Sequence, residues 1–317
     1  MRRWVIVALL IVAAFIVFSV FRYAGGAPRN VNVVIPAGSS LTSAAKTLEQ
    51  AGAIKSSGAF LTDARLFGSK DPIRPGEYRI TRGMGPETIL RLLQSGKTLQ
   101  RFIVVPEGMP SILVYEKLMA TPLLTGTVAT PAEGSLLPDA YAYTRGDPRS
   151  VVVGRMQKAM QTALANAWKA RKPSTAVTTP EAALILASIV EKETALASER
   201  RMVAGVYSNR LKQAMPLQAD PTTIYPITRG KPLGRRILRS ELQAKNGYNT
   251  YQMTGLPTGP ITNPGKKSII AVLDPAPTDA LYFVANGSGG SSFAATLAQH
   301  NANVQKYYAL RRSRGEM

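Results

Sequence analysis

The sequence predicts an α+β protein made of an N-terminal transmembrane helix, a small βααβ module and a larger mixed α+β domain with an open cleft. An uncharged apolar run begins near the N-terminus, and short strand-like and helix-like segments follow it. The remainder combines amphipathic helices with a long stretch rich in Gly, Pro, Asn and Tyr, which is typical of loops that build binding clefts. A hydrophobic content of 45% and a charged content of 18% are those of a folded chain.

Residues 4–21 form an uncharged apolar run of 18 residues. As a helix, this run is just long enough to cross the hydrocarbon core of a bilayer, with Trp4 and Tyr23 placed to lie at the interfaces. A cleaved signal peptide is one alternative, although its apolar region would be long and its cleavage site poor. A buried core helix is another, disfavoured because such helices keep a polar face. Because Arg2 and Arg3 precede the run, we expect that end in the cytoplasm and the remainder outside.

The chain is strongly basic, with 39 Lys and Arg against 19 Asp and Glu and a formal charge of +20. That charge fits nucleic acid, anionic lipid headgroups or an acidic polymer, but export across a membrane argues against nucleic acid as a partner. The absence of cysteine excludes disulfides, thiolate metal sites and cysteine nucleophiles. His300 is the only histidine, so a zinc site or a Ser-His-Asp triad has at most one candidate. We expect neither a metal nor a cofactor.

Residues 24–98, which follow the cytoplasmic end and anchor of residues 1–23, are expected to form a linker and the small module. Its expected elements are a strand at 31–36, a helix capped by Ser39 or Ser40 and stopped at Gly52, a helix at 58–67, a turn and strand at 74–80, and a helix from Pro86 to Gly96 that buries Ile89, Leu92 and Leu93. This β-α-α-β-α order resembles the LysM-like domain, a fold associated with glycan binding. A structural spacer is the alternative interpretation.

Residues 99–317 are expected to form the larger domain. Its expected elements are a strand and turn at 101–109, a loop at 131–147, an amphipathic helix at 151–171, a helix with Thr179 as N-cap and Pro180 as first residue, an irregular stretch at 230–265, a helix at 268–277, a strand at 280–287 and a frayed tail at 310–317. The glycine-rich sequence GSGGSS looks like a phosphate loop but lacks the Gly-Lys-Thr ending. It is interpreted as a flexible loop.

The sequence LILASIVEKETALASER carries Glu191 and Glu193 at the end of an apolar run. On a helix these two side chains point about 200° apart, so they face different environments. Glu193 follows Leu186 and Ile189 by seven and four residues and lies on their apolar stripe, whereas Glu191 falls on the far side with Ser188. A carboxyl on a buried face has a raised pKa, which suits a general acid near neutral pH.

Two alternatives remain open for these acids at this point. Glu193 could instead form a structural bridge with Arg200 or Arg201. A glycosidase that uses two carboxylates would need a second acid, for which Glu199 and Asp220 are the candidates, with Asp220 expected in a polar loop. Sequence spacing does not determine the distance of either one from Glu193.

Four blocks of the chain resemble one family. They are ASIVEKETALASER, VYSNRLKQAMPLQADPTTIY, YNTYQMTGLPTGPITNPG and LYFVANGSGG…FAATLAQHN. Their order and spacing over residues 100–308 are similar to those of the YceG-like endolytic murein transglycosylases, usually called MltG. The anchor and the LysM-like module match the remainder. The resemblance implies a membrane-anchored enzyme that cuts nascent peptidoglycan strands between N-acetylmuramic acid and N-acetylglucosamine.

The family's catalytic glutamate is the second of its E-K-E block, which is Glu193 here. The resemblance implies that Glu193 protonates the glycosidic oxygen and then takes the proton of the sugar's own C6 hydroxyl, giving a 1,6-anhydro-muramyl end without water. It also implies a set of substrate-binding cleft residues: Glu199, Arg200, Asn209, Arg210, Gln218, Asp220, Thr222, Tyr248, Asn249, Tyr251 and Asn263. Among them, Gln218, Asp220 and Asn249 are expected to bind or orient sugar and peptide groups.

The chain departs from the family's D-G-x-G-G-H pattern at Asn286 and Ser291, while His300 and Asn301 keep its closing H-N pair. Because Ser291 replaces an imidazole, a non-catalytic murein-binding scaffold is one alternative function. A muramidase that uses water is the other. The resemblance implies peptidoglycan strands as substrate and the bacterial inner membrane as location, with the catalytic domain on the periplasmic side and peptidoglycan synthases as candidate partners.

Overall fold

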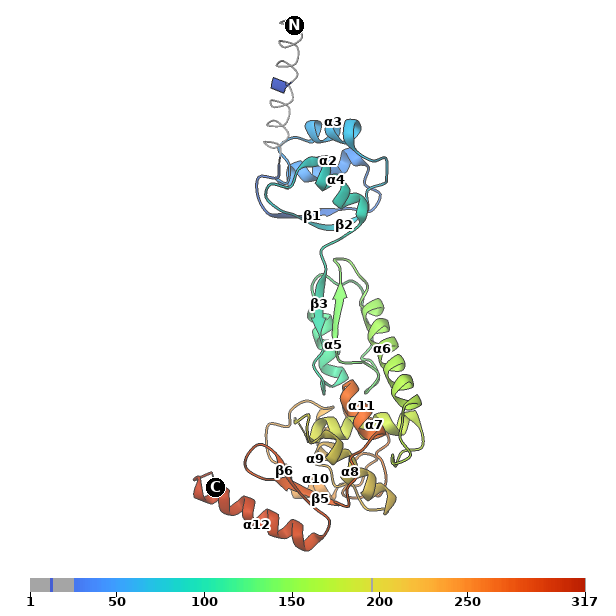
Figure 1. Cartoon of the computed structure of the whole chain (residues 1–317), viewed down its shortest axis with the longest axis vertical. Coiled ribbons are helices and arrows are strands. Elements are labelled where there is room, and N and C mark those ends of the chain that lie inside the picture. Colours follow the sequence, from blue (N-terminus) through green and yellow to red (C-terminus); the bar gives the residue numbers. More distant parts are fainter. Residues whose placement is uncertain (1–11, 14–25, 195, 317) are drawn as a thin grey trace, which may run out of the picture. The chain divides into compact units, whose positions relative to one another are not determined.

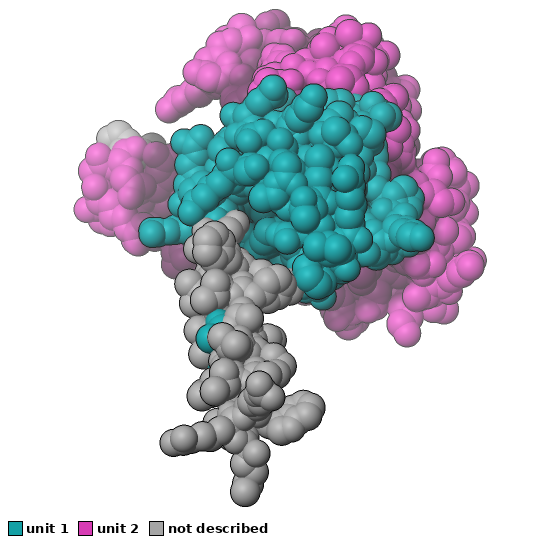
Figure 2. Space-filling model, turned by 90° about the horizontal axis from the view of Figure 1, so that it is seen from above, with its two compact units in different colours: residues 1–101, 142–146 teal, residues 102–141, 147–317 magenta. Residues whose placement is uncertain are grey.

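The computed structural model describes residues 12–13, 26–194 and 196–316, and these fall into two compact units (Figure 1). The first unit takes the chain up to residue 101 together with residues 142–146, and the second takes residues 102–141 and 147–317 (Figure 2). The predicted anchor at residues 4–21 lies outside the described residues except for positions 12 and 13. Among the helices that are described, none has both the length and the apolar character needed to span a membrane.

The first unit is built on one antiparallel pair of strands, in which Val33 of β1 faces Tyr78 of β2. Its elements in chain order are β1 (Val31–Ile35), α2 (Leu41–Gln50), α3 (Ser57–Phe67), β2 (Gly76–Ile80) and α4 (Pro86–Ser95). The helices pack against the strands and against one another around a buried apolar core. This β-α-α-β-α order is the one expected from the sequence.

Local signals set the helix ends of the first unit. The Ser40 side chain accepts a hydrogen bond from the backbone N–H of Ser43 and caps α2. Gly96 ends α4 in the left-handed region, at φ 68°, where glycine carries no steric penalty. One expected detail differs, because α4 buries Leu90 completely and Leu92 only partly.

Helices outnumber strands in the described part of the second unit. The elements that follow α4 along the chain are β3 (Arg101–Val104), α5 (Ser111–Ala120), β4 (Ala140–Tyr143), α6 (Arg149–Lys169), α7 (Pro180–Glu193), α8 (Arg200–Lys212), α9 (Asp220–Thr228), α10 (Arg239–Gln243), α11 (Lys266–Leu273), β5 (Tyr282–Ala285), β6 (Ser291–Ala294) and α12 (Leu297–Ser313). β3 pairs with β4, and β5 pairs with β6. The expectation of a loop throughout residues 131–147 was wrong, because the short alternation AYAY in that segment forms β4.

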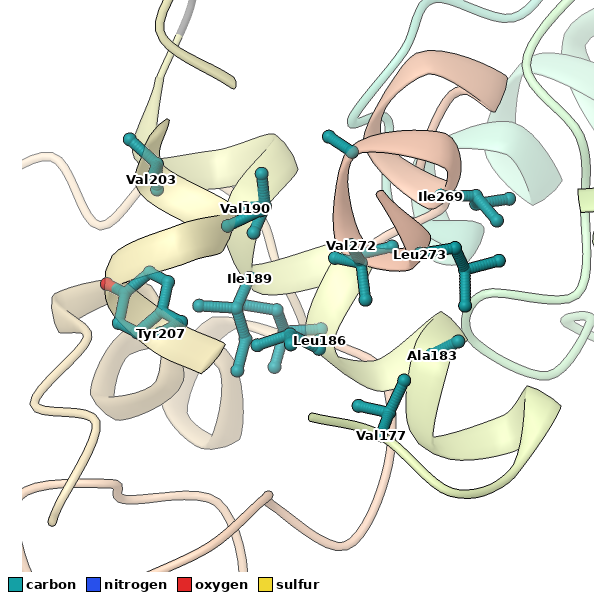
Figure 3. Close-up of a cluster of buried hydrophobic side chains, with 14 of the residues drawn as sticks. Val177, Ala183, Leu186, Ile189, Val190, Val203, Tyr207, Ile269, Val272 and Leu273 are labelled. Atoms are coloured by element: carbon teal, nitrogen blue, oxygen red, sulfur yellow. The ribbon is translucent and has the colours of Figure 1, made fainter. Parts of the chain in front are cut away.

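Helix α7 lies in the core of the second unit (Figure 3). Thr179 caps it and Pro180 is its first residue, as expected. Its side chains Leu186, Ile189 and Val190 pack with residues of α8 and α11, and all three are fully buried. Because α8 and α11 pack against the second half of α7, its last residue, Glu193, lies in a packed environment.

The C-terminal part forms a hairpin and a helix. The sequence GSGGSS spans the turn between β5 and β6 and the start of β6, so it is an ordered turn rather than a flexible loop. α12 packs against both strands of this hairpin. It begins with a capping box between Thr296 and Gln299 and continues to Ser313. The expectation that the tail frays from residue 310 was therefore wrong for its first turn.

Candidate active site around Glu193

A pocket of about 300 Å³ in the second unit is lined by the carboxyl-bearing end of α7 and by groups from distant parts of the chain. The lining residues are Glu193, Tyr207, Arg210, Leu217, Gln218, Asp220, Tyr251, Phe283 and His300. They come from α7, α8, the segment between α8 and α9, the start of α9, the irregular stretch after α10, β5 and α12. Five of them were expected from the sequence: Glu193, Arg210, Gln218, Asp220 and Tyr251.

Glu193 is the last residue of α7, and its carboxyl is the acid of this pocket. Burial raises its pKa from 4.5 to about 7, because an ionised carboxylate loses hydration there. The Tyr207 hydroxyl, which hydrogen-bonds the carboxyl, and the nearby Arg210 charge oppose the rise in pKa, whereas Asp220 adds to it. At neutral pH the carboxyl is therefore present in both protonation states, as a group that must give and take a proton requires.

Arg210 shapes the pocket as well as charging it. The side chain is buried, and its Nε donates to the Leu281 carbonyl at 2.7 Å. Its Nη1 donates to the Leu217 carbonyl at 2.9 Å and to Gln218 Oε1 at 3.3 Å. Gln218 has a φ of 53°, an uncommon conformation for a residue other than glycine. Arg210 thus holds a strained turn that presents Leu217 and Gln218 to the pocket.

Asp220 and Tyr251 form a hydrogen-bonded pair in the same pocket, with 2.6 Å between the Tyr251 hydroxyl, which donates, and Asp220 Oδ1. Asp220 is the first residue of α9, where a helix N-terminus favours a carboxylate. The expectation that it lies in a polar loop was therefore wrong. Burial and the bond to Asp220 raise the pKa of Tyr251, so its hydroxyl remains a donor at neutral pH.

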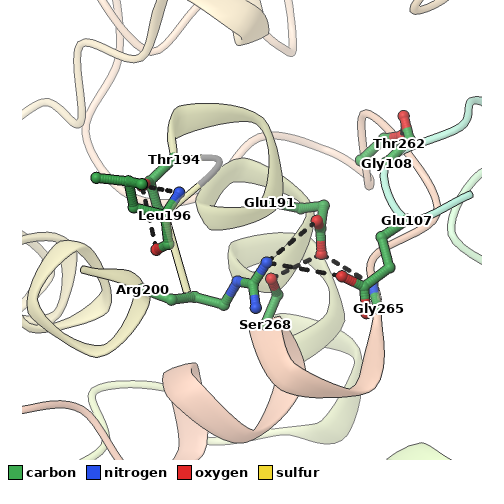
Figure 4. Close-up of polar contacts among 9 residues, drawn as sticks. All are labelled: Glu107, Gly108, Glu191, Thr194, Leu196, Arg200, Thr262, Gly265 and Ser268. Carbon is green, nitrogen blue, oxygen red and sulfur yellow. Dashed lines mark hydrogen bonds and ion pairs between the residues drawn. The ribbon is translucent and has the colours of Figure 1, made fainter. Parts of the chain in front are cut away.

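Glu191 occupies a different and equally buried environment (Figure 4). Its Oε2 accepts hydrogen bonds from the Gly265 N–H at 2.9 Å and the Ser268 hydroxyl at 2.7 Å. Its Oε1 lies 3.8 Å from Nη2 of Arg200, and the same nitrogen lies 3.6 Å from Oε2 of Glu107. The Glu191 side chain is only 6% exposed, so it lies in the protein interior and not on an exposed face of the helix.

Two expectations about the helix face are thereby corrected. Ser188 is fully buried and Glu191 nearly so, because α11 covers the side of α7 that was assigned to the far face. The alternative in which Glu193 is bridged to an arginine is also wrong. Arg200 pairs with Glu191 and Glu107, while Arg201 pairs with Asp274 at 3.0 Å.

Comparison with known proteins identifies the family. The model of the YceG-like family matches residues 33–306. The chain belongs to the YceG-like family. It is 30% identical to the endolytic murein transglycosylase of Bacillus subtilis, an alignment that covers 87% of this chain and 84% of the relative. It is 27% identical to the endolytic murein transglycosylase of Streptococcus pneumoniae D39 and spans 58% of that protein's length.

A solved structure supports the fold of this YceG-like chain. It is the crystal structure of a yceG-like protein from Listeria monocytogenes, determined at 2.6 Å. The two chains are 27% identical and superpose with a TM-score of 0.53, covering 87% of this chain and 99% of the other.

The structure does not bring all the predicted residues of this YceG-like chain into the pocket. Those that lie elsewhere are Glu199, Arg200, Asn209, Thr222, Tyr248, Asn249 and Asn263. Glu199 accepts from the Ser291 N–H at 2.7 Å and the Ser291 hydroxyl at 2.8 Å, which ties the loop after α7 to β6. Ser291 is therefore engaged in a structural contact with Glu199.

The buried amides and hydroxyls in this group hold backbone. Asn249 Nδ2 donates to three carbonyl oxygens of residues 241, 242 and 244, and Asn263 Nδ2 donates to the Met109 carbonyl at 2.9 Å. Asn209 Nδ2 donates to the carbonyls of residues 278 and 280. Thr222 bonds Thr250 within the same core at 2.8 Å. Irregular stretches need such side chains because their backbone carbonyls have no hydrogen-bond partners within a helix or a sheet.

Four lining residues were not predicted: Tyr207, Leu217, Phe283 and His300. Tyr207 and Leu217 lie within the second signature block, and Phe283 and His300 in the fourth, but residue type alone does not indicate that they face an acid. In the part of the chain that the structure describes, no group of three or more His, Asp or Glu residues is placed to hold a metal ion.

A larger hollow of about 870 Å³ lies between α6, α11 and residues 137–141. Many of its lining residues are aliphatic, and Glu193 is not part of it. Its charged lining residues are Asp139, Arg155, Lys158, Lys266 and Asp274. We assign the chemistry to the smaller pocket because a carboxyl with a raised pKa stands there beside hydrogen-bonding groups.

Proposed function

We propose that this protein is a membrane-anchored endolytic lytic transglycosylase, which cleaves the MurNAc–GlcNAc bond of nascent peptidoglycan strands and leaves 1,6-anhydroMurNAc ends. The observation that carries the proposal is the Glu193 carboxyl, whose pKa is raised to about 7 in a polar pocket. Relatives named endolytic murein transglycosylase, similar over 87% of this chain, support the same reaction.

One carboxyl suffices for this reaction. Glu193 in its protonated form gives its proton to the glycosidic oxygen while the bond from that oxygen to C1 of the muramyl unit breaks. The resulting carboxylate takes the proton of the muramyl C6 hydroxyl, and O6 then bonds to C1. The leaving sugar keeps the proton that Glu193 gave up, and the proton of O6 replaces it on the carboxyl. No water is consumed, and Glu193 returns to its protonated state.

The other polar groups of the pocket position the substrate in this proposal. Asp220, held by Tyr251, offers a carboxylate, and Gln218 offers an amide fixed by Arg210. These are groups that accept from and donate to sugar hydroxyl and acetamido groups. Asn209, Asn249 and Asn263, which lie outside the pocket, support it in this proposal through the backbone carbonyls that they bond.

The proposal includes the anchor and the module. Residues 4–21 span the bacterial inner membrane in this proposal, and the second unit works on the extracytoplasmic side, where peptidoglycan synthases are the expected neighbours. The first unit is proposed to be a LysM-like module. A hollow of about 320 Å³ there, lined by residues 39–41 and 69–73 among others, is its candidate glycan site.

A muramidase is a second candidate function, because Asp220 shares the pocket with Glu193 and a carboxylate pair can activate water. Digestion of uncross-linked murein by the full-length protein, followed by mass spectrometry, separates the candidates. Anhydro-ended fragments support the transglycosylase, whereas fragments heavier by one water would identify a muramidase. Binding of glycan without either product would identify a scaffold.

The assignment of Glu193 is tested by Glu193→Gln. We expect this variant to fold, to bind glycan and to release no anhydro-ended fragments. Glu181→Gln, at the exposed start of the same helix, is the matched control and should cleave like the unaltered protein. Cleavage by Glu193→Gln at the normal rate would show that another group is the acid.

A further inference from the structure

His300, the only histidine of the chain, lines the Glu193 pocket although it lies more than a hundred residues away in sequence. It is in the first turns of α12, directly after the capping box. Its ring stacks on that of Tyr282, with centroids 5.3 Å apart and planes at 27°. The hairpin that carries Tyr282 thus fixes the orientation of the imidazole.

The two ring nitrogens of His300 differ in their surroundings. Nδ1 is buried, and no described residue gives it a hydrogen-bond partner. A proton on Nδ1 would be a buried donor without an acceptor, which costs about 1–3 kcal/mol. The proton of the neutral ring is therefore expected on Nε2, the tautomer in which the buried nitrogen carries only a lone pair. Nε2 is not among the buried unpaired atoms, and none of the described residues bonds it.

Three features keep this ring neutral. Burial lowers the pKa of His300, and the positive charge of Arg210 lowers that pKa further. Arg210 is close, since its guanidinium lies 5.2 Å from the centroid of the same Tyr282 ring. The N-terminal end of α12 also disfavours a second positive charge. A neutral imidazole with its proton on Nε2 can donate one hydrogen bond but cannot act as a general acid at neutral pH.

Several other polar groups of the pocket are already engaged. Asp220 accepts from Tyr251, and Arg210 donates through Nε and Nη1 to backbone carbonyls and to Gln218 Oε1. The Tyr207 hydroxyl is turned to Glu193. An N–H of His300, with its ring fixed by stacking on Tyr282, is one of the donors that a bound sugar meets here.

We propose that His300 is a substrate-binding residue of this pocket, whose neutral ring donates its Nε2–H to a hydroxyl or acetamido oxygen of the bound glycan. This proposal rests on the proposed function for the identity of the substrate. Glu193 carries both proton transfers, and His300 contributes orientation. Burial and Arg210 lower the pKa of His300 and so favour its neutral form, in a pocket that Glu193, Asp220, Arg210, Tyr207 and Tyr251 also face.

A single histidine makes the test direct. In the full-length chain labelled with ¹⁵N-histidine, long-range ¹H–¹⁵N spectra contain one imidazole and report its tautomer without a mutation. We expect the Nε2–H form at pH 7, and a change in the Nε2 resonance of Glu193→Gln when purified uncross-linked glycan strands are added. The Nδ1–H form, or an unchanged resonance at saturating bound glycan, would overturn the proposal.

Variants give a second readout. His300→Ala should raise KM by about 2- to 13-fold, the loss of one hydrogen bond, with little change in kcat or in the pH profile. His300→Gln, whose amide nitrogen reaches the place of Nε2, should recover part of that loss. His300→Asn, one methylene shorter, is the matched control and should not.

The two proposals fail in distinguishable ways. Normal kinetics in folded His300→Ala would refute the role of His300 and leave the proposed function intact. If the unaltered protein neither bound nor cut glycan, the proposed function would fail, and the substrate named for His300 would fail with it.

Discussion

The raised pKa of Glu193 should be visible as a pH-dependent cost in stability. Below pH 4.5 the carboxyl is protonated in both the folded and the unfolded chain, so it contributes no penalty. Between pH 4.5 and about 7 it ionises in the unfolded chain while it stays protonated in the folded one, and the free energy of unfolding falls. Above pH 7 it is ionised in both states and the loss is complete.

The size of the loss follows from the two pKa values. A shift from 4.5 to about 7 corresponds to about 3 kcal/mol, since one pKa unit is about 1.4 kcal/mol. This figure is an upper value, because Glu193 as a whole residue retains some contact with solvent. Glu193→Gln has no ionised form to penalise. Its stability relative to the unaltered protein should therefore increase from pH 4.5 to pH 8 by up to that amount.

Urea unfolding at several pH values measures this difference, with Trp168 in α6 as a fluorescent reporter within the second unit. Every other titrating group is common to the two proteins and cancels in the difference. Glu181→Gln, exposed at the start of α7, is the matched control for replacing a carboxyl of this helix by an amide. A difference for Glu193→Gln that is constant within about 0.5 kcal/mol would refute the buried-acid argument.

Three further changes test neighbouring contacts. Tyr207→Phe removes a bond that lowers the pKa of Glu193, so the alkaline limb of the activity profile should move to higher pH; an unmoved limb would contradict the contact. Arg200→Met leaves Glu191 buried without its cation and should cost about 3–5 kcal/mol in urea unfolding, much of it restored by adding Glu191→Gln. The Arg149 guanidinium donates to four backbone carbonyls, and a lysine ammonium cannot reach all of them. Arg149→Lys should therefore lower the free energy of unfolding by at least about 2 kcal/mol, and a smaller loss would contradict the importance of these four bonds.

Much of the secondary structure could be predicted because its signals are local. Ser40, Thr179 with Pro180, and Gly96 act on backbone within a few residues of themselves, and each helix end lies where these residues place it. The missed elements have weak local signals. β4 is four residues long, and α12 carries its apolar and polar residues without a clear stripe.

The raised pKa of Glu193 was also predictable, since its carboxyl stands at the end of an apolar helix. The position of Glu193 on the apolar stripe of α7 does not by itself distinguish it from Glu191, because Glu191 is buried as well. What separates the two acids is their partners. Arg200, Ser268 and Gly265 surround Glu191, whereas Tyr207, Asp220 and Arg210 surround Glu193.

The sequence by itself determined the family, the order of elements in the first unit and the candidate acid, Glu193. Only the tertiary structure decided which acid is neutralised and which keeps a pKa of about 7, and which of the polar residues face the pocket. The physical reason is distance along the chain. Capping and periodicity act over one or two turns, but the environment of Glu193 is built by residues up to His300, and packing alone brings them together.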